Sequence, residues 1–199
     1  MYTVSPSTKG LIFDLDGTIV DSMPAHLLSW QAAFRAFGET FTEEFCYAHA
    51  GVSLTGVVEI FNRENGTSLS PEAVVSKKDE AFVTYLDRIR PIPQVLDILK
   101  RYNGKLPMAV ASGNTRPLSV VLLERLGLIE YFDALVFGEE VSTPKPDPES
   151  FLTAARLMGV PPKTCEVFED GDHGLAAAKR AGMIAVDIRP WLTATSSQP

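Results

Sequence analysis

The sequence predicts an α/β protein whose core is a doubly wound parallel sheet, with an all-helical segment inserted into it. From residue 91 onward, short apolar segments alternate with helical ones, as a parallel sheet covered by helices requires. Another short apolar segment, residues 9–13, lies near the N-terminus, and the stretch after it has helical periodicity and no convincing strand. We therefore expect residues 1–22 and 89–199 to form the α/β core, and residues 23–88 to form a helical cap.

The first predicted strand, residues 9–13, ends at two carboxylates. Side chains alternate along a strand, so Asp14 and Asp16 should share one side while Leu15 points into packing. Gly17 suits a sharp turn that lets backbone amides approach a ligand. Two like charges held this close require a cation, and oxygen ligands of this kind suit Mg²⁺. A lone pair of this type is also common at a strand end or a helix cap, so the interpretation needs partners elsewhere in the chain.

The inserted segment is predicted to contain four helices, because apolar residues recur at helical spacing between capping and terminating residues. Polar residues or prolines stand at the expected starts, and glycines stand at several expected ends. The expected starts are, in order, Asp21 or Ser22, Thr42, Ser53 and Ser70, and the expected ends include Gly38, Ala50 and Gly66.

The remaining elements follow the same periodicity rules through the second part of the core. The expected strands are residues 108–112, 134–137, 166–168 and 184–188, and the expected helices are residues 93–102, 117–126, 149–158 and 174–181. Residues 193–199 have the composition of a disordered end.

Composition narrows the range of partners and locations. The chain has 199 residues and a net charge of −7, so nucleic acid and anionic membranes are unsuitable partners by long-range electrostatics. Cys46 and Cys165 lie far apart without metal-ligand spacing, which indicates two free thiols in a reducing compartment. We find no signal-peptide pattern and no transmembrane run. We expect a cytoplasmic protein, either a monomer or a weak dimer.

Polar residues follow each predicted strand of the core at the point where the strand ends. Ser112, Gly113 and Asn114 follow the second strand, Lys145 lies past the third, and an acidic pair at residues 169–170 follows the fourth. Each of these features alone has a simpler explanation: residues 112–114 could form a turn, Lys145 could be a solvated surface lysine, and the acidic pair could cap a helix. Ligands of open α/β sheets bind at the carboxyl ends of strands, so their joint occurrence predicts one site.

With these residues the chain resembles the haloacid dehalogenase superfamily over nearly its whole length. The four motifs of that family correspond to residues 14–18, 111–113, 145–148 and 168–170. The helical stretch after the first motif is similar to the small cap of the subgroup that holds β-phosphoglucomutase and small sugar-phosphate phosphatases, with the fructose-1-phosphatase type the most similar. Gly171 departs from the serine that is commoner there, which concerns a supporting hydroxyl and not the carboxylate before it.

The resemblance implies a reaction through a phosphorylated aspartate. Asp14 would attack phosphorus, and Asp16 would protonate the leaving oxygen and then activate water. The implied phosphate-binding residues are Ser112, Gly113, Asn114 and Lys145, with Arg116 as a further neighbour. The implied Mg²⁺ ligands are Asp14, the backbone carbonyl of Asp16 and Asp170, with Glu169 beside or among them.

The resemblance also implies substrate contacts from the cap, at His26 and Lys78. Both have alternatives, because His26 could be a satisfied polar residue on a packed helix and Lys78 a solvated surface lysine. A cap of this kind would exclude large phosphorylated macromolecules.

We therefore expect a Mg²⁺-dependent phosphatase that hydrolyses a small phosphorylated metabolite, with a sugar phosphate as the expected substrate class and an aspartyl phosphate as the intermediate. The main alternative is a sugar phosphomutase, in which an arginine follows the Gly-Val-Ser that matches residues 51–53. Here that position is Leu54, whose aliphatic side chain cannot offset the charge of a second phosphate. Arg63 or Lys78 could compensate from elsewhere in the cap, which keeps the mutase as an alternative. A receiver-like phosphoacceptor domain is a remote alternative, because its modified aspartate lies on a later strand and no helical insertion follows.

Overall fold

The computed structural model describes residues 2–49 and 52–192. The chain forms two compact units, Met1–Asp21 with Arg90–Pro199, and Ser22–Ile89, which we call the sheet unit and the helical unit. The predicted boundaries between core and cap differ from these by one residue at each junction. Ala50, where we expected a helix to end, and the predicted disordered end at residues 193–199 lie outside the described residues.

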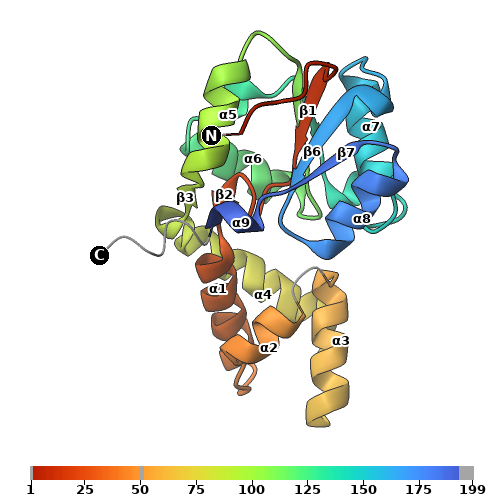
Figure 1. Ribbon diagram of the computed structural model, residues 1–199. Coiled ribbons are helices and arrows are strands. Elements are labelled where there is room, and N and C mark those ends of the chain that lie inside the picture. The colour runs from red at the N-terminus through yellow and green to blue at the C-terminus, as the bar shows by residue number, and fades with distance from the viewer. Residues whose placement is uncertain (1, 50–51, 193–199) are drawn as a thin grey trace. The chain divides into compact units, whose positions relative to one another are not determined.

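The sheet unit is built on five parallel strands in the order β5-β4-β1-β6-β7 (Figure 1). The central strand β1 pairs with β4 on one side and β6 on the other, with Phe13 opposite Val110 and Phe168. The strands are β1 Gly10–Phe13, β4 Met108–Ala111, β5 Ala134–Val136, β6 Cys165–Glu169 and β7 Ile184–Asp187. The prediction of a parallel α/β core is confirmed.

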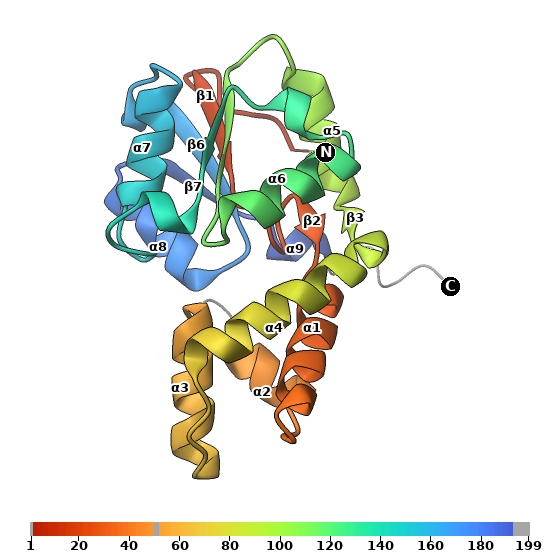
Figure 2. The same ribbon diagram turned by 180° about the vertical axis from the view of Figure 1, so that it is seen from behind.

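Helices cover both faces of this sheet. α7 and α8 pack on one face, and α5 and α6 lie on the opposite face (Figures 1 and 2). The α-helices of the sheet unit are α5 Pro93–Tyr102, α6 Arg116–Arg125, α7 Glu149–Leu157, α8 Asp172–Arg180 and α9 Arg189–Leu192. Single 3₁₀ turns occur at η2 Ile129–Tyr131, η3 Gly138–Glu140 and η4 Pro162–Thr164.

Strand alternation divides the core of the sheet unit between the two faces. Ile12 and Val167 point toward α7 and α8 and join a buried cluster with Phe151. Phe13 and Phe168 point to the other face and stack on each other with ring centroids 4.7 Å apart. The strand ends that carry the predicted site are therefore fixed by fully buried neighbours on both faces.

The junction between the units contains a pairing that the sequence did not predict. β2 Val20–Asp21 and β3 Arg90–Pro91 form a two-stranded antiparallel ribbon, with Val20 opposite Pro91. Two residues are too few to show a strand period. The ribbon joins the point where the chain leaves the sheet unit to the point where it returns.

The helical unit contains the four predicted helices and the 3₁₀ turn η1 Leu86–Arg88. Thr42, Ser53 and Ser70 cap their helices as expected, each accepting a hydrogen bond from a backbone amide three residues on. The first helix begins where it was expected, with Ser22 at the N-cap position, but Ser22 has a helical conformation and its side chain makes no capping hydrogen bond. The helices are α1 Met23–Ala36, α2 Glu43–Ala48, α3 Leu54–Asn65 and α4 Pro71–Thr84.

Aromatic side chains fill the interior of the helical unit. Phe34 lies at its centre, with ring centroids 4.3 Å from Phe61 and 4.8 Å from Phe41. Trp30 stacks on Phe41 at 5.6 Å. Across residues 2–49 and 52–192, none of the helices combines the length and apolar character that crossing a membrane would require.

Candidate active site

The site is built at the carboxyl ends of the parallel strands. Asp14 directly follows β1, Glu169 is the last residue of β6, and Asp170 comes next. Lys145 lies on the segment between β5 and α7. Because β1 and β6 are hydrogen-bonded neighbours, their carboxylates meet at one edge of the sheet.

Lys145 joins two of these carboxylates. Its Nζ lies 2.6 Å from Asp14 Oδ1 and 2.6 Å from Glu169 Oε1. The ammonium also lies 4.7 Å from the centroid of the Phe151 ring, which helps to exclude water. The three charged side chains are at most 14% exposed. Charge-assisted hydrogen bonds with so little water fix the lysine in one position.

Burial and neighbouring charge shift the pKa values of this pair. Burial raises the pKa of the Asp14 carboxyl, the Lys145 ammonium opposes that rise, and Glu169 adds to it. Burial also disfavours a charged Lys145, but the carboxylates of Asp14 and Glu169 outweigh burial and raise the pKa of the lysine. Lys145 therefore stays protonated, and it is the group that favours the ionised form of Asp14.

A second set of contacts places three carboxylates around one point. Oxygen atoms of Asp14, Glu169 and Asp170 all lie within 4.8 Å of one another, the one such group among the described residues that could hold a metal ion. Burial raises the pKa of Asp170 to about 6, and a hydrogen bond from Thr18 Oγ1 at 2.8 Å opposes this. A donor set made only of carboxylate oxygens fits a hard cation such as Mg²⁺.

Gly17 explains how the turn after β1 approaches Asp170. Its φ of +77° is in the left-handed region, and an added Cβ would overlap the Asp170 carboxylate, with Asp170 Cγ 2.8 Å away. Glycine is therefore required both for the turn and for the space.

Asp16 and the segment after β4 form a further part of the site. Asn114 Nδ2 donates to Asp16 Oδ2, and the backbone N–H of Asn114 donates to Ser112 Oγ at 3.2 Å. Ser112 is buried. The structure thus links Asn114, predicted as a phosphate-binding residue, to the predicted general acid. The expected roles of Ser112, Gly113 and Asn114 toward phosphate stay predictions.

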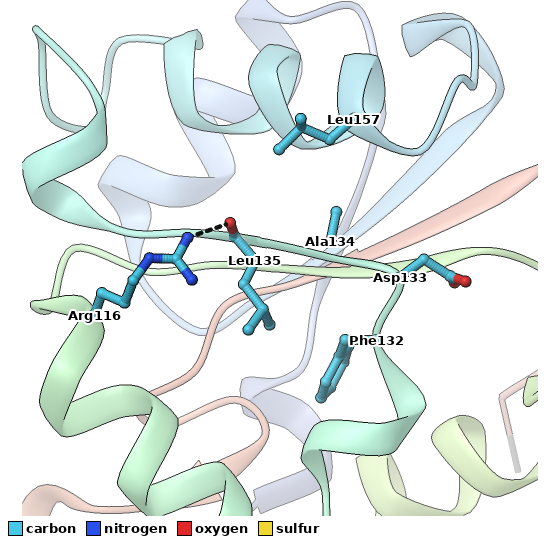
Figure 3. A pocket seen from close by; sticks show the side chains of 6 residues that line it. All are labelled: Arg116, Phe132, Asp133, Ala134, Leu135 and Leu157. Carbon is cyan, nitrogen blue, oxygen red and sulfur yellow. Dashed lines mark hydrogen bonds between the residues drawn. The ribbon is translucent and has the colours of Figure 1, made fainter.

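Arg116 makes its own set of contacts, and its expected place beside the phosphate stays a prediction. Its guanidinium pairs with Glu140, with Nε 2.6 Å from Oε1, and donates to the carbonyl oxygen of Leu135 at 3.1 Å. Figure 3 shows this residue in a pocket along β5, lined with Phe132, Asp133, Ala134, Leu135 and Leu157. None of the other predicted site residues lines that pocket.

The two candidates in the helical unit make aromatic contacts there. The His26 ring stacks on Phe82 at 4.5 Å, and Lys78 Nζ lies 4.8 Å from the same ring and 6.0 Å from that of Trp30. Lys78 is 1% exposed, so its interpretation as a solvated surface lysine is wrong. Its contact with substrate, like that of His26, stays a prediction.

Sequence reasoning missed two supporting contacts, those of Thr18 with Asp170 and of Asn114 with Asp16. Both join residues that are more than ninety positions apart. The sequence does show that a hydroxyl and an amide side chain lie near strand-end carboxylates. Only the fold shows which carboxylate each of them contacts.

Comparison with known proteins places this geometry among related enzymes. A family model described as haloacid dehalogenase-like hydrolase matches residues 11–188. Fructose-1-phosphate phosphatase YqaB of Escherichia coli is 40% identical over 181 residues, covering 90% of this chain and 96% of that protein. A phosphorylated carbohydrates phosphatase of Thermotoga maritima and β-phosphoglucomutase of Bacillus subtilis are each 30% identical, covering 88% and 90% of this chain and 82% and 83% of those proteins.

A solved structure agrees with this placement. A hydrolase from Pseudomonas syringae superimposes with a TM-score of 0.78 at 27% identity, covering 90% of this chain and 84% of that one.

Proposed function

Because the chain belongs to the haloacid dehalogenase-like hydrolase family, we propose that this phosphoric monoester hydrolase acts on a small sugar phosphate, uses Mg²⁺ and forms an aspartyl phosphate. The observation that carries the proposal is the pair of 2.6 Å contacts from Lys145 to Asp14 and Glu169, beside the third carboxylate Asp170. Two relatives, a fructose-1-phosphate phosphatase and a phosphorylated carbohydrates phosphatase, support the substrate class.

Asp14 is the proposed nucleophile. A carboxylate oxygen of Asp14 attacks phosphorus, and the bond from phosphorus to the ester oxygen breaks. The attack requires the ionised carboxylate, which the protonated Lys145 favours against the effect of burial. The same ammonium offsets the repulsion between the carboxylate and the anionic phosphate.

Asp16 is the proposed general acid and base. Its proton passes to the leaving ester oxygen, so that an alcohol departs instead of an alkoxide. The resulting Asp16 carboxylate then takes a proton from the water that attacks the aspartyl phosphate, which releases inorganic phosphate and restores Asp14. The hydrogen bond from Asn114 Nδ2 to Asp16 Oδ2 holds this carboxyl group in one orientation.

Asp14 and Asp170 would hold Mg²⁺, with the backbone carbonyl of Asp16, and with Glu169 at the edge of the same group. When bound, the ion supplies positive charge that reduces the repulsion among the carboxylates and the phosphate. Two of the three carboxylates, Asp14 and Glu169, also contact Lys145, so the protein itself supplies part of this compensation.

The test is phosphate release by the purified protein from a panel of sugar phosphates, polyol phosphates and a phosphoprotein. We expect turnover of small sugar phosphates, loss of turnover in EDTA and recovery with Mg²⁺. Turnover of the phosphoprotein with none of the sugar phosphates would contradict the proposed substrate class. Full activity in EDTA would contradict the proposed metal.

A sugar phosphomutase is the second candidate, favoured by the 30% identity to β-phosphoglucomutase of Bacillus subtilis. Leu54, the first residue of α3, argues against it, because an aliphatic side chain cannot offset the charge of a second phosphate group.

A further inference from the structure

The Glu169 carboxylate is held in place through both of its oxygens. Oε1 accepts a hydrogen bond from Lys145 Nζ at 2.6 Å, and Oε2 accepts one from the backbone N–H of Gly171 at 2.8 Å. The side chain is 4% exposed. A carboxylate so deeply buried has little freedom to find other partners, so its position depends on the space that surrounds it.

Gly174 supplies part of that space. It lies in the first turn of α8 and is buried. A Cβ built on Gly174 would overlap Oε1 and Cδ of Glu169 and would lie 2.6 Å from Oε2. The three nearest atoms all belong to this one carboxyl group, so the Glu169 carboxylate occupies the space of the missing side chain.

The backbone gives no reason for glycine at this position. Gly174 is absent from the glycines that have positive φ, so an L-residue can adopt its conformation. Glycine is also a poorer helix former than any residue except proline, so local preference favours alanine there. The reason for the glycine is therefore found in the contact with Glu169.

We propose that Gly174 is a positioning residue, whose missing side chain seats the Glu169 carboxylate where it holds Lys145 against Asp14. A side chain at position 174 would displace Glu169, and Lys145 Nζ would lose one of its two carboxylate partners. The ammonium would then no longer be fixed beside Asp14. The effect on turnover rests on the proposed function, whereas the effect on the position of Glu169 does not.

The first test measures stability and does not depend on activity. Gly174→Ala should lower the thermal midpoint in the otherwise unchanged protein, because the added methyl group collides with a buried carboxylate. In a Glu169→Ala background the collision is absent, so the same substitution should raise the midpoint through its helix preference. A change of the same sign in both backgrounds would overturn the proposal.

The second test follows Lys145 directly by lysine side-chain ¹⁵N NMR in metal-free protein, with its signal assigned through Lys145→Met. Gly174→Ala should shift or broaden that signal, and Glu169→Ala should do the same. His173→Ala is the matched control, because this neighbouring helical side chain is exposed and the substitution also favours the helix. A Lys145 signal unchanged by Gly174→Ala would overturn the proposal.

The third test is a double-mutant cycle of Gly174→Ala and Glu169→Ala, measured as turnover of a sugar phosphate. Gly174→Ala should lower kcat at least tenfold with KM changed less than threefold, and it should change kcat less than twofold when Glu169 is already alanine. Equal losses in both backgrounds would overturn the proposal. If Gly174→Ala alone does not fold, the Glu169→Ala double variant should restore folding, and its failure would also overturn the proposal. If even the unchanged protein shows no turnover, the proposed function is wrong. The thermal midpoints and the NMR signal of Lys145 would still decide the role of Gly174.

Discussion

Lys145 is the positive charge that partly balances the carboxylates of the site. Three carboxylates, those of Asp14, Glu169 and Asp170, surround one point, and Lys145 contacts two of them. One ammonium cannot offset three ionised carboxylates, and both burial and the neighbouring carboxylates disfavour the charged forms of Asp14 and Asp170, which raises their pKa values. The site therefore favours a further cation, in agreement with the proposed Mg²⁺.

Asp14→Asn should abolish turnover while leaving the fold intact. The amide has nearly the shape of the carboxylate but cannot form an aspartyl phosphate, so we expect a loss of roughly 10³-fold or more in kcat. Phosphate release and circular dichroism would be measured together. Asp97→Asn is the matched control, because Asp97 is exposed on α5 and its substitution should leave kcat unchanged. Turnover by Asp14→Asn at the rate of the unchanged protein would refute the assignment.

The two cysteines should react slowly with thiol reagents in the folded protein. Cys46 and Cys165 are both free and buried, as their lack of paired spacing predicted. Burial raises the pKa of both thiols, that of Cys165 to about 11, so little thiolate is present at pH 8. We expect the native reaction with an aromatic disulfide to be at least about tenfold slower than in guanidinium, where both thiols react. Rapid native reaction of either cysteine would contradict the burial.

At the scale of elements, sequence periodicity predicted the five parallel strands and most helices because long apolar patterns decide them. The same patterns do not identify β2 and β3, whose two residues each are too short to show a period. α9 was also missed, since Arg189–Leu192 has only four residues and is separated from the end of β7 by one residue. The strand-end carboxylates and Lys145 were predictable from position alone, but the contact between Glu169 and Gly174 depends on how α8 packs beside β6.

The start of the chain is tied to β6 through the buried side chain of Glu166. Its Oε1 accepts hydrogen bonds from the backbone N–H of Ser5 at 2.7 Å and from Thr8 Oγ1 at 2.6 Å, and its Oε2 accepts one from the Tyr2 hydroxyl at 2.9 Å. These three donors satisfy both oxygens of the buried carboxylate. Glu166 therefore anchors three residues of the N-terminal segment to β6.

Glu166→Gln should therefore destabilise the protein. The amide nitrogen replaces an acceptor with a donor, so at least one of the three donors loses its partner at a cost of about 1–3 kcal/mol. Tyr2→Phe removes a single, partly exposed hydrogen bond and should cost less, about 0.5–1.5 kcal/mol. Urea unfolding would measure both, with Glu130→Gln as the exposed control. If the Glu166 and Glu130 variants unfold at the same urea concentration, the proposed anchoring is wrong.

On the scale of the whole molecule, the predicted catalytic residues and the predicted substrate-contacting residues belong to different units. The carboxylates and Lys145 all belong to the sheet unit, whereas His26, Lys78 and Leu54 belong to the helical unit. In the proposed mechanism, the attack on phosphorus therefore depends on residues of the sheet unit. We expect the choice between hydrolysis and transfer to depend on whether the helical unit offers a partner for a second phosphate. A positively charged side chain is the feature that a bisphosphate would require there.

Leu54 gives the last prediction, which separates hydrolysis from phosphate transfer within the sugar. With β-glucose 1-phosphate and a trace of the 1,6-bisphosphate, phosphorus NMR should show inorganic phosphate appearing faster than glucose 6-phosphate. Leu54→Arg should raise the ratio of glucose 6-phosphate to inorganic phosphate, because a guanidinium can hold the phosphate that is not reacting. Leu54→Gln is the control, since it removes the same packing against the aromatic core of the helical unit without adding charge. Glucose 6-phosphate that accumulates faster than phosphate in the unchanged protein would show that another cation replaces the missing arginine, and that the enzyme is a mutase.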